Sequence, residues 1–173
     1  MKTKLLALAL VSLFAINGAM AQEQGEIRAG LGLVLGTKAG VSDTGESKIG
    51  FGLSPSVEYL ITDVISGNAS YDFYFKSSVG GVDYKLSYLN IEGKYYFMTD
   101  DLQVYGLAGI GVGFAKAEAN GVSASTSETG LNIGGGVCLP LTDVLGFNGE
   151  LKYQTAGDGQ LAIKAGVFYT FGN

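Results

Sequence analysis

Residues 161–171, Leu-Ala-Ile-Lys-Ala-Gly-Val-Phe-Tyr-Thr-Phe, carry an apolar side chain at every second position. This series consists of Leu161, Ile163, Ala165, Val167, Tyr169 and Phe171. A period of two is the repeat of a β-strand, in which successive side chains point to opposite faces of the sheet. The stretch therefore predicts a strand with one apolar face.

The same alternation recurs along most of the chain. It is found in residues 27–35, 49–59, 104–114, 131–139 and 145–153, and we add strands at Val64–Lys76 and Tyr84–Phe97. No window after residue 21 has a helical repeat of apolar residues. The sequence thus predicts an all-β fold with eight strands.

The connections between these strands are of two kinds. Short polar turns occur at Thr62-Asp63, Thr99-Asp100-Asp101 and Thr142-Asp143, and longer Gly/Ser-rich connections at Lys38–Ser47, Ser77–Asp83, Ala117–Thr129 and Thr155–Gly159. Short turns that alternate with longer loops indicate an antiparallel up-and-down meander, which is the topology of small outer-membrane barrels.

Composition excludes several classes of function. The chain has 173 residues, 47% of them hydrophobic and only 16% charged, with a net charge of −5 and no histidine. An acidic chain with scattered bases offers no surface for nucleic acid. Without histidine it has no His-based triad or metal site, and the single Cys138 forms neither an intrachain disulfide nor a zinc cluster. We expect no cofactor, no metal and no enzymatic activity.

The polar face of the predicted strands suits the inside of a narrow barrel. Twelve glycines lie on it, and glycine relieves crowding in an eight-stranded lumen. Between them lie our candidate lumen residues, which are Arg28, Glu58, Asn68, Asp72, Glu92, Lys94, Asn132, Asn148, Glu150, Lys152 and Lys164. Burial makes pairing of such charges necessary. A hairpin centred on Gly157 places Glu150 opposite Lys164, so we expect these two to form an ion pair.

The apolar face has the layering of a surface that contacts lipid. Tyr59, Tyr95, Phe97, Tyr169 and Phe171 fall near the short turns, and Phe51, Phe73, Phe75, Phe114 and Tyr153 toward the loops. Two aromatic girdles around an aliphatic band are typical of a transmembrane β-barrel. The alternative is a secreted, lipocalin-like binding barrel.

The first 21 residues have the features of an export signal. Lys2 and Lys4 precede a short apolar run, and Ala19-x-Ala21 forms a cleavage motif. We predict a cleaved signal peptide at residues 1–21 and a barrel domain at residues 22–173.

Several motifs resemble the small outer-membrane β-barrel family of Gram-negative bacteria, the OmpA/OmpX-type porin-like domains. Tyr88-Leu-Asn-Ile-Glu-Gly-Lys-Tyr-Tyr-Phe97 is similar to the family's fourth strand, and Val104-Tyr-Gly-Leu-Ala-Gly-Ile-Gly-Val-Gly-Phe114 to its fifth. Lys164, Gly166, Tyr169 and Phe171 resemble the signal read by the barrel-assembly machinery, although Gly172 and Asn173 follow where the family usually ends on the aromatic residue.

The resemblance implies a monomeric, integral outer-membrane protein that contacts lipid and lipopolysaccharide, and the assembly machinery and periplasmic chaperones during biogenesis. Barrel enzymes of this size use a histidine that this chain lacks. Two non-enzymatic functions remain. One is a structural or surface-interaction protein with a filled polar lumen, and the other is a narrow pore or lateral-exit transporter for small solutes.

Overall fold

The computed structural model describes residues 24–42 and 44–171, so the expected signal peptide lies outside the described residues. The described chain is all-β. Its strands are β1 (Ile27–Val41), β2 (Ser47–Leu60), β3 (Ile65–Tyr74), β4 (Ser77–Val79), β5 (Val82–Met98), β6 (Gln103–Ala119), β7 (Val122–Pro140), β8 (Leu145–Gln154) and β9 (Gln160–Phe171). Within these two ranges, no helix is long and apolar enough to cross a membrane.

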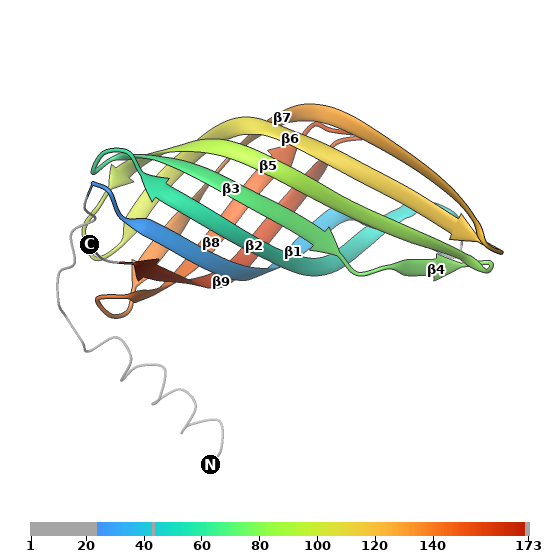
Figure 1. The fold of residues 1–173 in the computed structure, drawn as a ribbon, viewed down its shortest axis with the longest axis horizontal. Coiled ribbons are helices and arrows are strands. Elements are labelled where there is room, and N and C mark those ends of the chain that lie inside the picture. Colours follow the sequence, from blue (N-terminus) through green and yellow to red (C-terminus); the bar gives the residue numbers. More distant parts are fainter. Residues whose placement is uncertain (1–23, 43, 172–173) are drawn as a thin grey trace, which may run out of the picture.

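The strands close into a barrel. Consecutive strands pair in antiparallel fashion, except that β3 and β4 both pair with β5, and β1 closes the sheet by pairing with β9 from Ile27↔Phe171 to Gly36↔Ala162. The short β4 continues the path of β3 along β5, after an interruption at residues 75–76. The two segments thus act as one strand, which confirms the prediction of an eight-stranded antiparallel barrel (Figure 1).

The apolar face of the strands points outward. Leu33 is 64% exposed and Ile133 is 65% exposed, whereas Val34, next to Leu33, is 1% exposed and lies inside. A soluble protein rarely leaves such a continuous apolar surface in contact with water. The inverted arrangement, with aliphatic side chains outside and charges inside, fits a lipid bilayer.

The aromatic girdles lie on this outer surface. Near the short turns, Tyr95 contacts Phe97 and Tyr169 contacts Phe171, with ring centroids 5.3 and 4.9 Å apart. Toward the loops, Phe73 contacts Phe75 at 6.0 Å. Aromatic side chains at both ends of an aliphatic band mark the two membrane interfaces.

The short turns owe their sequence to side-chain capping. The hydroxyl Oγ1 of Thr62 accepts hydrogen bonds from the backbone N–H groups of Val64 and Ile65, at 3.3 and 3.0 Å. Thr142 accepts the equivalent bonds from Val144 and Leu145. At these two turns the Thr-Asp pattern thus closes the chain tightly at the start of β3 and of β8.

Two of the expected loops are largely strand, which corrects the prediction. Most of Ala117–Thr129 continues the β6–β7 ladder, and only Asn120 and Gly121 turn the chain. Their φ angles of 48° and 80° are those of a two-residue type I′ hairpin, for which Asn-Gly is the preferred sequence. Gly80 and Gly81 turn β4 into β5 in the same way, at φ 58° and 81°.

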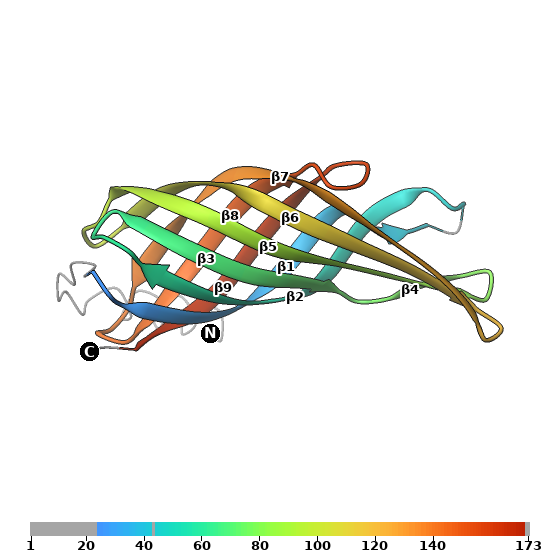
Figure 2. The same cartoon turned by 45° about the horizontal axis from the view of Figure 1, so that its top comes forward.

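The long ladders form a protruding sheet, which we call the tongue and define as residues 77–87 and 114–130. It consists of β4 with the adjoining parts of β5, β6 and β7, and both views show it extending well beyond the β8–β9 hairpin, while the β1–β2 hairpin projects somewhat less far at the same end (Figures 1 and 2). The tongue lies at the end opposite the Ile27–Phe171 pair, which joins β1 to β9.

Arginine at Leu33 tests the orientation of the sheet. Leu33→Arg is expected to lower the free energy of unfolding by about 2–4 kcal/mol, because the charge would face hydrocarbon near mid-depth. The matched control is Val122→Arg, at a site 74% exposed on the tongue and beyond the lipid. Urea titration in lipid vesicles measures both values. Equal losses for the two variants would contradict the assigned depth.

Candidate functional site

Lys152 is the centre of the charged network in the lumen. Its ammonium Nζ lies 2.5 Å from Glu92 Oε1, 3.8 Å from Glu150 Oε1 and 3.9 Å from Asp72 Oδ2. The side chains of Lys152, Glu92 and Asp72 have no exposure to solvent. The single ammonium group of Lys152 therefore offsets part of the negative charge of three carboxylates, which come from the strands β3, β5 and β8.

Lys164 provides the second cation of this network. It lies opposite Glu150 in the β8–β9 ladder, which is the register expected from a hairpin centred on Gly157. Its nearest carboxylate, however, is across the lumen, because Nζ is 2.7 Å from Asp72 Oδ1 and 3.6 Å from Glu150 Oε1. The expected pair thus exists as the weaker of two contacts.

A second cluster lies toward the short turns. Glu58 accepts hydrogen bonds from Lys94 Nζ at 2.9 Å and from the Tyr96 hydroxyl at 2.6 Å, and a further one from the Ser66 hydroxyl. Arg28 lies 3.1 Å from Glu26 and stacks over the ring of Phe168, 5.1 Å from its centroid.

The buried charges balance. Among the described residues, the charged side chains buried inside the barrel are Arg28, Lys94, Lys152 and Lys164 with Glu58, Asp72, Glu92 and Glu150. Four positive charges thus face four negative ones in a medium where an isolated ion is costly. These eight are the charged members of the predicted lumen set, and its three asparagines, Asn68, Asn132 and Asn148, also make hydrogen bonds inside the barrel.

Uncharged amides complete the network. Asn90 donates to Asp72 Oδ2 at 2.9 Å, Gln154 donates to the same oxygen at 3.1 Å, and Gln160 donates to Gln154 at 3.2 Å. Asn132 bridges Asn90 and Glu92. Asn90, Gln154 and Gln160 were not among the predicted lumen residues, although each alternates with outward-facing apolar residues along its strand, which is a signal that could have identified them.

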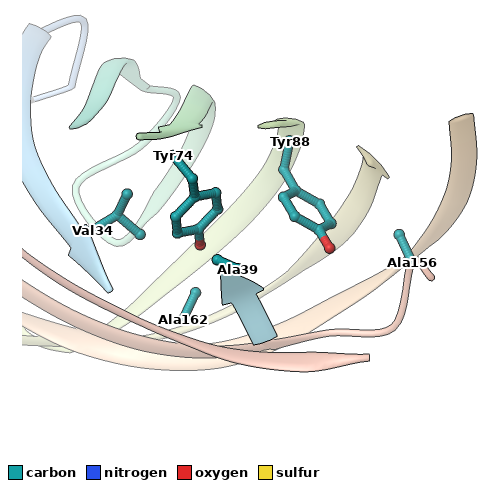
Figure 3. Packing of buried hydrophobic residues seen from close by; sticks show 6 residues of the cluster. All are labelled: Val34, Ala39, Tyr74, Tyr88, Ala156 and Ala162. Carbon is teal, nitrogen blue, oxygen red and sulfur yellow. The ribbon is translucent and has the colours of Figure 1, made fainter. Parts of the chain in front are cut away.

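An apolar layer closes the lumen on the side of the tongue. Figure 3 shows the rings of Tyr74 and Tyr88 pointing into the barrel beside small side chains, and the cluster consists of Val34, Ala39, Tyr74, Tyr88, Ala156 and Ala162. The two rings meet edge to face, with centroids 6.3 Å apart. We call this cluster the lid.

Little space remains inside. A cavity of about 40 Å³ lies between Arg28, Lys94, Glu150 and Lys164, with the buried Cys138 in its wall. Because one water needs roughly 10–15 Å³ of such volume, the cavity has room for only a few waters. Glycine is required where strands approach closely: a Cβ on Gly134 would collide with the backbone of Leu151 and Lys152.

The remaining candidate residues, those of the assembly signal, divide between the two faces of β9. Lys164 points into the network and Gly166 packs against Gly32, whereas Tyr169 and Phe171 point outward in ring contact. Within the described ranges, no group of three or more acidic or cysteine side chains is placed to hold a metal ion.

The tongue provides the other candidate surface. Its inner face borders a cavity of about 400 Å³ at the mouth of the barrel, lined by Tyr84, Leu86 and Ala117 and, from the β1–β2 hairpin, by Lys38 and Val41. Residues 122–130 of β7 pair with β6, while the β7–β8 ladder begins only at Asn132. At the β7 edge of the tongue, the backbone of residues 122–130 is therefore not part of the β7–β8 ladder.

The sequence matches the model of one known protein family. The sequence model of the outer membrane protein beta-barrel domain matches residues 6–171. None of the curated proteins matches the chain.

Solved structures share the fold at low identity. Ail, the attachment invasion locus protein of Yersinia pestis, is 22% identical with a TM-score of 0.63, over 86% of this chain and 99% of Ail. The N-terminal β-barrel domain of Pseudomonas aeruginosa OprF is 20% identical with a TM-score of 0.66, over 87% and 100% of the two chains. Neisserial surface protein A has the same identity and TM-score, over 90% and 100%.

Proposed function

Because the chain belongs to the outer membrane protein beta-barrel domain family, we propose that it is a closed barrel that anchors a surface-interaction element, the tongue, in the bacterial outer membrane. The barrel serves as the membrane anchor and the tongue makes the contacts. The family accounts for the location, whereas the choice between an anchor and a pore rests on the lumen.

The filled lumen is the observation that carries this proposal. Lys152 and Lys164 join carboxylates from opposite walls of the barrel, and the lid covers them on the side of the tongue. An ion that crosses would have to separate buried pairs, and a buried charge without its partner costs several kcal/mol. The alternative function, a narrow pore or lateral-exit transporter for small solutes, requires an open path for the solute. The packed lumen argues against such a path.

The tongue supports the interaction part of the proposal. An edge strand without a neighbour presents unpaired N–H and C=O groups, which natural sheets either cover or use to bind another strand. On the β7 side, the β8–β9 hairpin ends well short of the tip of the tongue and leaves that edge uncovered (Figure 2). We further propose that Lys164, Gly166, Tyr169 and Phe171 act as the assembly signal.

Single-channel recording tests the closed barrel. The refolded protein is inserted in a planar bilayer, after heat-modifiable gel mobility has established that it is folded. We expect no steady conductance, because the network blocks the lumen. A sustained, ion-selective current at neutral pH would overturn the proposal in favour of the pore.

A further inference from the structure

The outer face of the tongue, at its base, is concave. A cavity of about 440 Å³ lies there, across β3, β5, β6 and β7. The side chains of Tyr71, Phe73 and Phe114 line the part near the barrel, and Lys85 and Lys116 line the part near the tip. An aromatic floor with a basic rim distinguishes this surface from the aliphatic band below it.

The two lysines form an unusual pair. Lys85 lies directly opposite Lys116 in the β5–β6 ladder, and like charges in that position repel one another. The carboxylate of Glu118 holds them together, because its Oε2 is 2.6 Å from Lys85 Nζ and its Oε1 is 2.5 Å from Lys116 Nζ. Two ammonium groups are therefore fixed beside each other on the surface.

This arrangement persists over a wide pH range. Hydrogen bonds from Lys116 and Lys85 lower the pKa of Glu118 to about 2, and the bond from Glu118 raises the pKa of Lys85. The carboxylate is thus ionised, and the lysine protonated, at any pH near neutrality. On the same outer face Lys76 pairs with Asp83 at 2.7 Å, so the three cations of this face meet two carboxylates and one positive charge remains, whereas Glu128 lies on the opposite face of the sheet.

Hydroxyl groups surround the pair on the side of the barrel. Ser127, Phe114 and Ser87 form one row across β7, β6 and β5, and Ser125, Lys116 and Lys85 form the next row toward the tip. The Tyr71 hydroxyl donates to Ser87 Oγ at 2.9 Å. Ammonium and hydroxyl donors that converge on one concave surface suit an anion with several acceptor oxygens.

The depth of the site in the membrane identifies the kind of anion. Phe73 and Phe114 belong to the aromatic girdle toward the loops, which lies at the boundary between hydrocarbon and headgroups. Lys116 follows Phe114 by two residues, about 7 Å farther along the strand. The lysine pair therefore lies at the level of the lipid headgroups, where the anionic groups are phosphates.

We propose that Lys85 and Lys116 bind the phosphate of an outer-leaflet lipid headgroup, whose sugar and upper acyl carbons rest on Tyr71, Phe73 and Phe114. The phosphorylated glucosamine of lipid A is the occupant with this combination of charge, hydroxyls and apolar chains. This inference rests on the proposed function, since it requires the tongue to lie above the outer leaflet.

Lipid retention in nanodiscs tests the site. The full chain is placed in nanodiscs of a zwitterionic phospholipid, and native mass spectrometry counts bound lipid A as its concentration is raised. Wild type is expected to retain phosphorylated lipid A at about tenfold lower concentration than Lys85→Gln/Lys116→Gln. The Lys85→Arg/Lys116→Arg variant is expected to keep the wild-type affinity, because the charges remain.

Matched controls separate this site from general charge. Lys48→Gln removes an exposed lysine from the β1–β2 hairpin, outside the cavity at the mouth of the barrel, and is expected to behave as wild type. Dephosphorylated lipid A is expected to bind wild type and the Gln variant equally. Equal retention of phosphorylated lipid A by wild type and Lys85→Gln/Lys116→Gln would overturn the inference.

Inorganic phosphate distinguishes the lipid from a soluble anion. We expect millimolar inorganic phosphate to leave lipid A bound, because the aromatic floor adds contacts that phosphate lacks. Displacement at that concentration would reassign the lysine pair to a free phosphate and overturn the lipid proposal. Channel recordings do not depend on these lysines, so the proposed function and this inference can fail separately.

Discussion

Lys152→Met is expected to lower the free energy of unfolding by about 3–5 kcal/mol, because it leaves a buried cluster of carboxylates without its central cation. Glu92 loses its partner at 2.5 Å, and Asp72 and Glu150 lose a cation within 4 Å. Methionine has a similar length and fills the same space, so the loss reports charge rather than a cavity.

Urea titration of the refolded protein in vesicles, followed by heat-modifiable gel mobility, measures this loss. Lys48→Met provides the control, since it removes the same charge from an exposed position on β2 and is expected to change stability by less than about 1 kcal/mol. Adding Glu92→Gln to Lys152→Met is expected to restore part of the loss. A stability within error of wild type for Lys152→Met would contradict the role of the network.

The fold could be predicted from sequence because a barrel in a membrane repeats one simple rule. Leu33 and Val34 illustrate it, since adjacent residues face lipid and lumen. A shift of one residue would expose every inward charge to hydrocarbon, so the alternation fixes both the strands and their orientation. The Thr-Asp turns fixed the hairpin ends, and the register of Glu150 with Lys164 followed from the centre of one short loop.

The tongue could not be predicted by the same rule. Beyond the bilayer neither face meets hydrocarbon, so residues 117–129 carry small polar side chains that resemble a loop. The decisive signals were local, namely Asn120-Gly121 and Gly80-Gly81, which favour two-residue hairpins and so extend the ladders. Giving more weight to these dipeptides than to composition would have recovered most of the tongue.

The sequence predicts which charged residues point into the lumen, but it does not predict which of them form ion pairs with one another. Parity places Asp72, Lys152 and Lys164 inside, yet their contacts join β3 to β8 and β9 across the barrel. Such pairs depend on the diameter of the closed sheet and on side-chain length, neither of which appears in the pairing of neighbouring strands. The sequence therefore favoured Glu150 as the partner of Lys164, whereas Asp72 is the nearer carboxylate.

Double-mutant cycles are expected to rank these two contacts. Lys164→Met and Asp72→Asn should each cost about 3–5 kcal/mol, because each leaves a buried partner uncompensated. Their coupling energy is expected to reach about 2–3 kcal/mol, near the upper end for residues in contact. The cycle of Lys164→Met with Glu150→Gln should give less than half of that value, because Nζ is 3.6 rather than 2.7 Å away.

The comparison is informative because Lys164 is shared by both cycles. Any general effect of Lys164→Met on packing or on insertion therefore cancels between the two coupling energies. Lys152 also lies within 4 Å of both Asp72 and Glu150, so it offsets part of either loss and weakens both couplings. If Glu150 coupled to Lys164 more strongly than Asp72 does, the contact along the β8–β9 ladder would dominate the network. The cross-barrel bridge would then not be what holds the lumen closed.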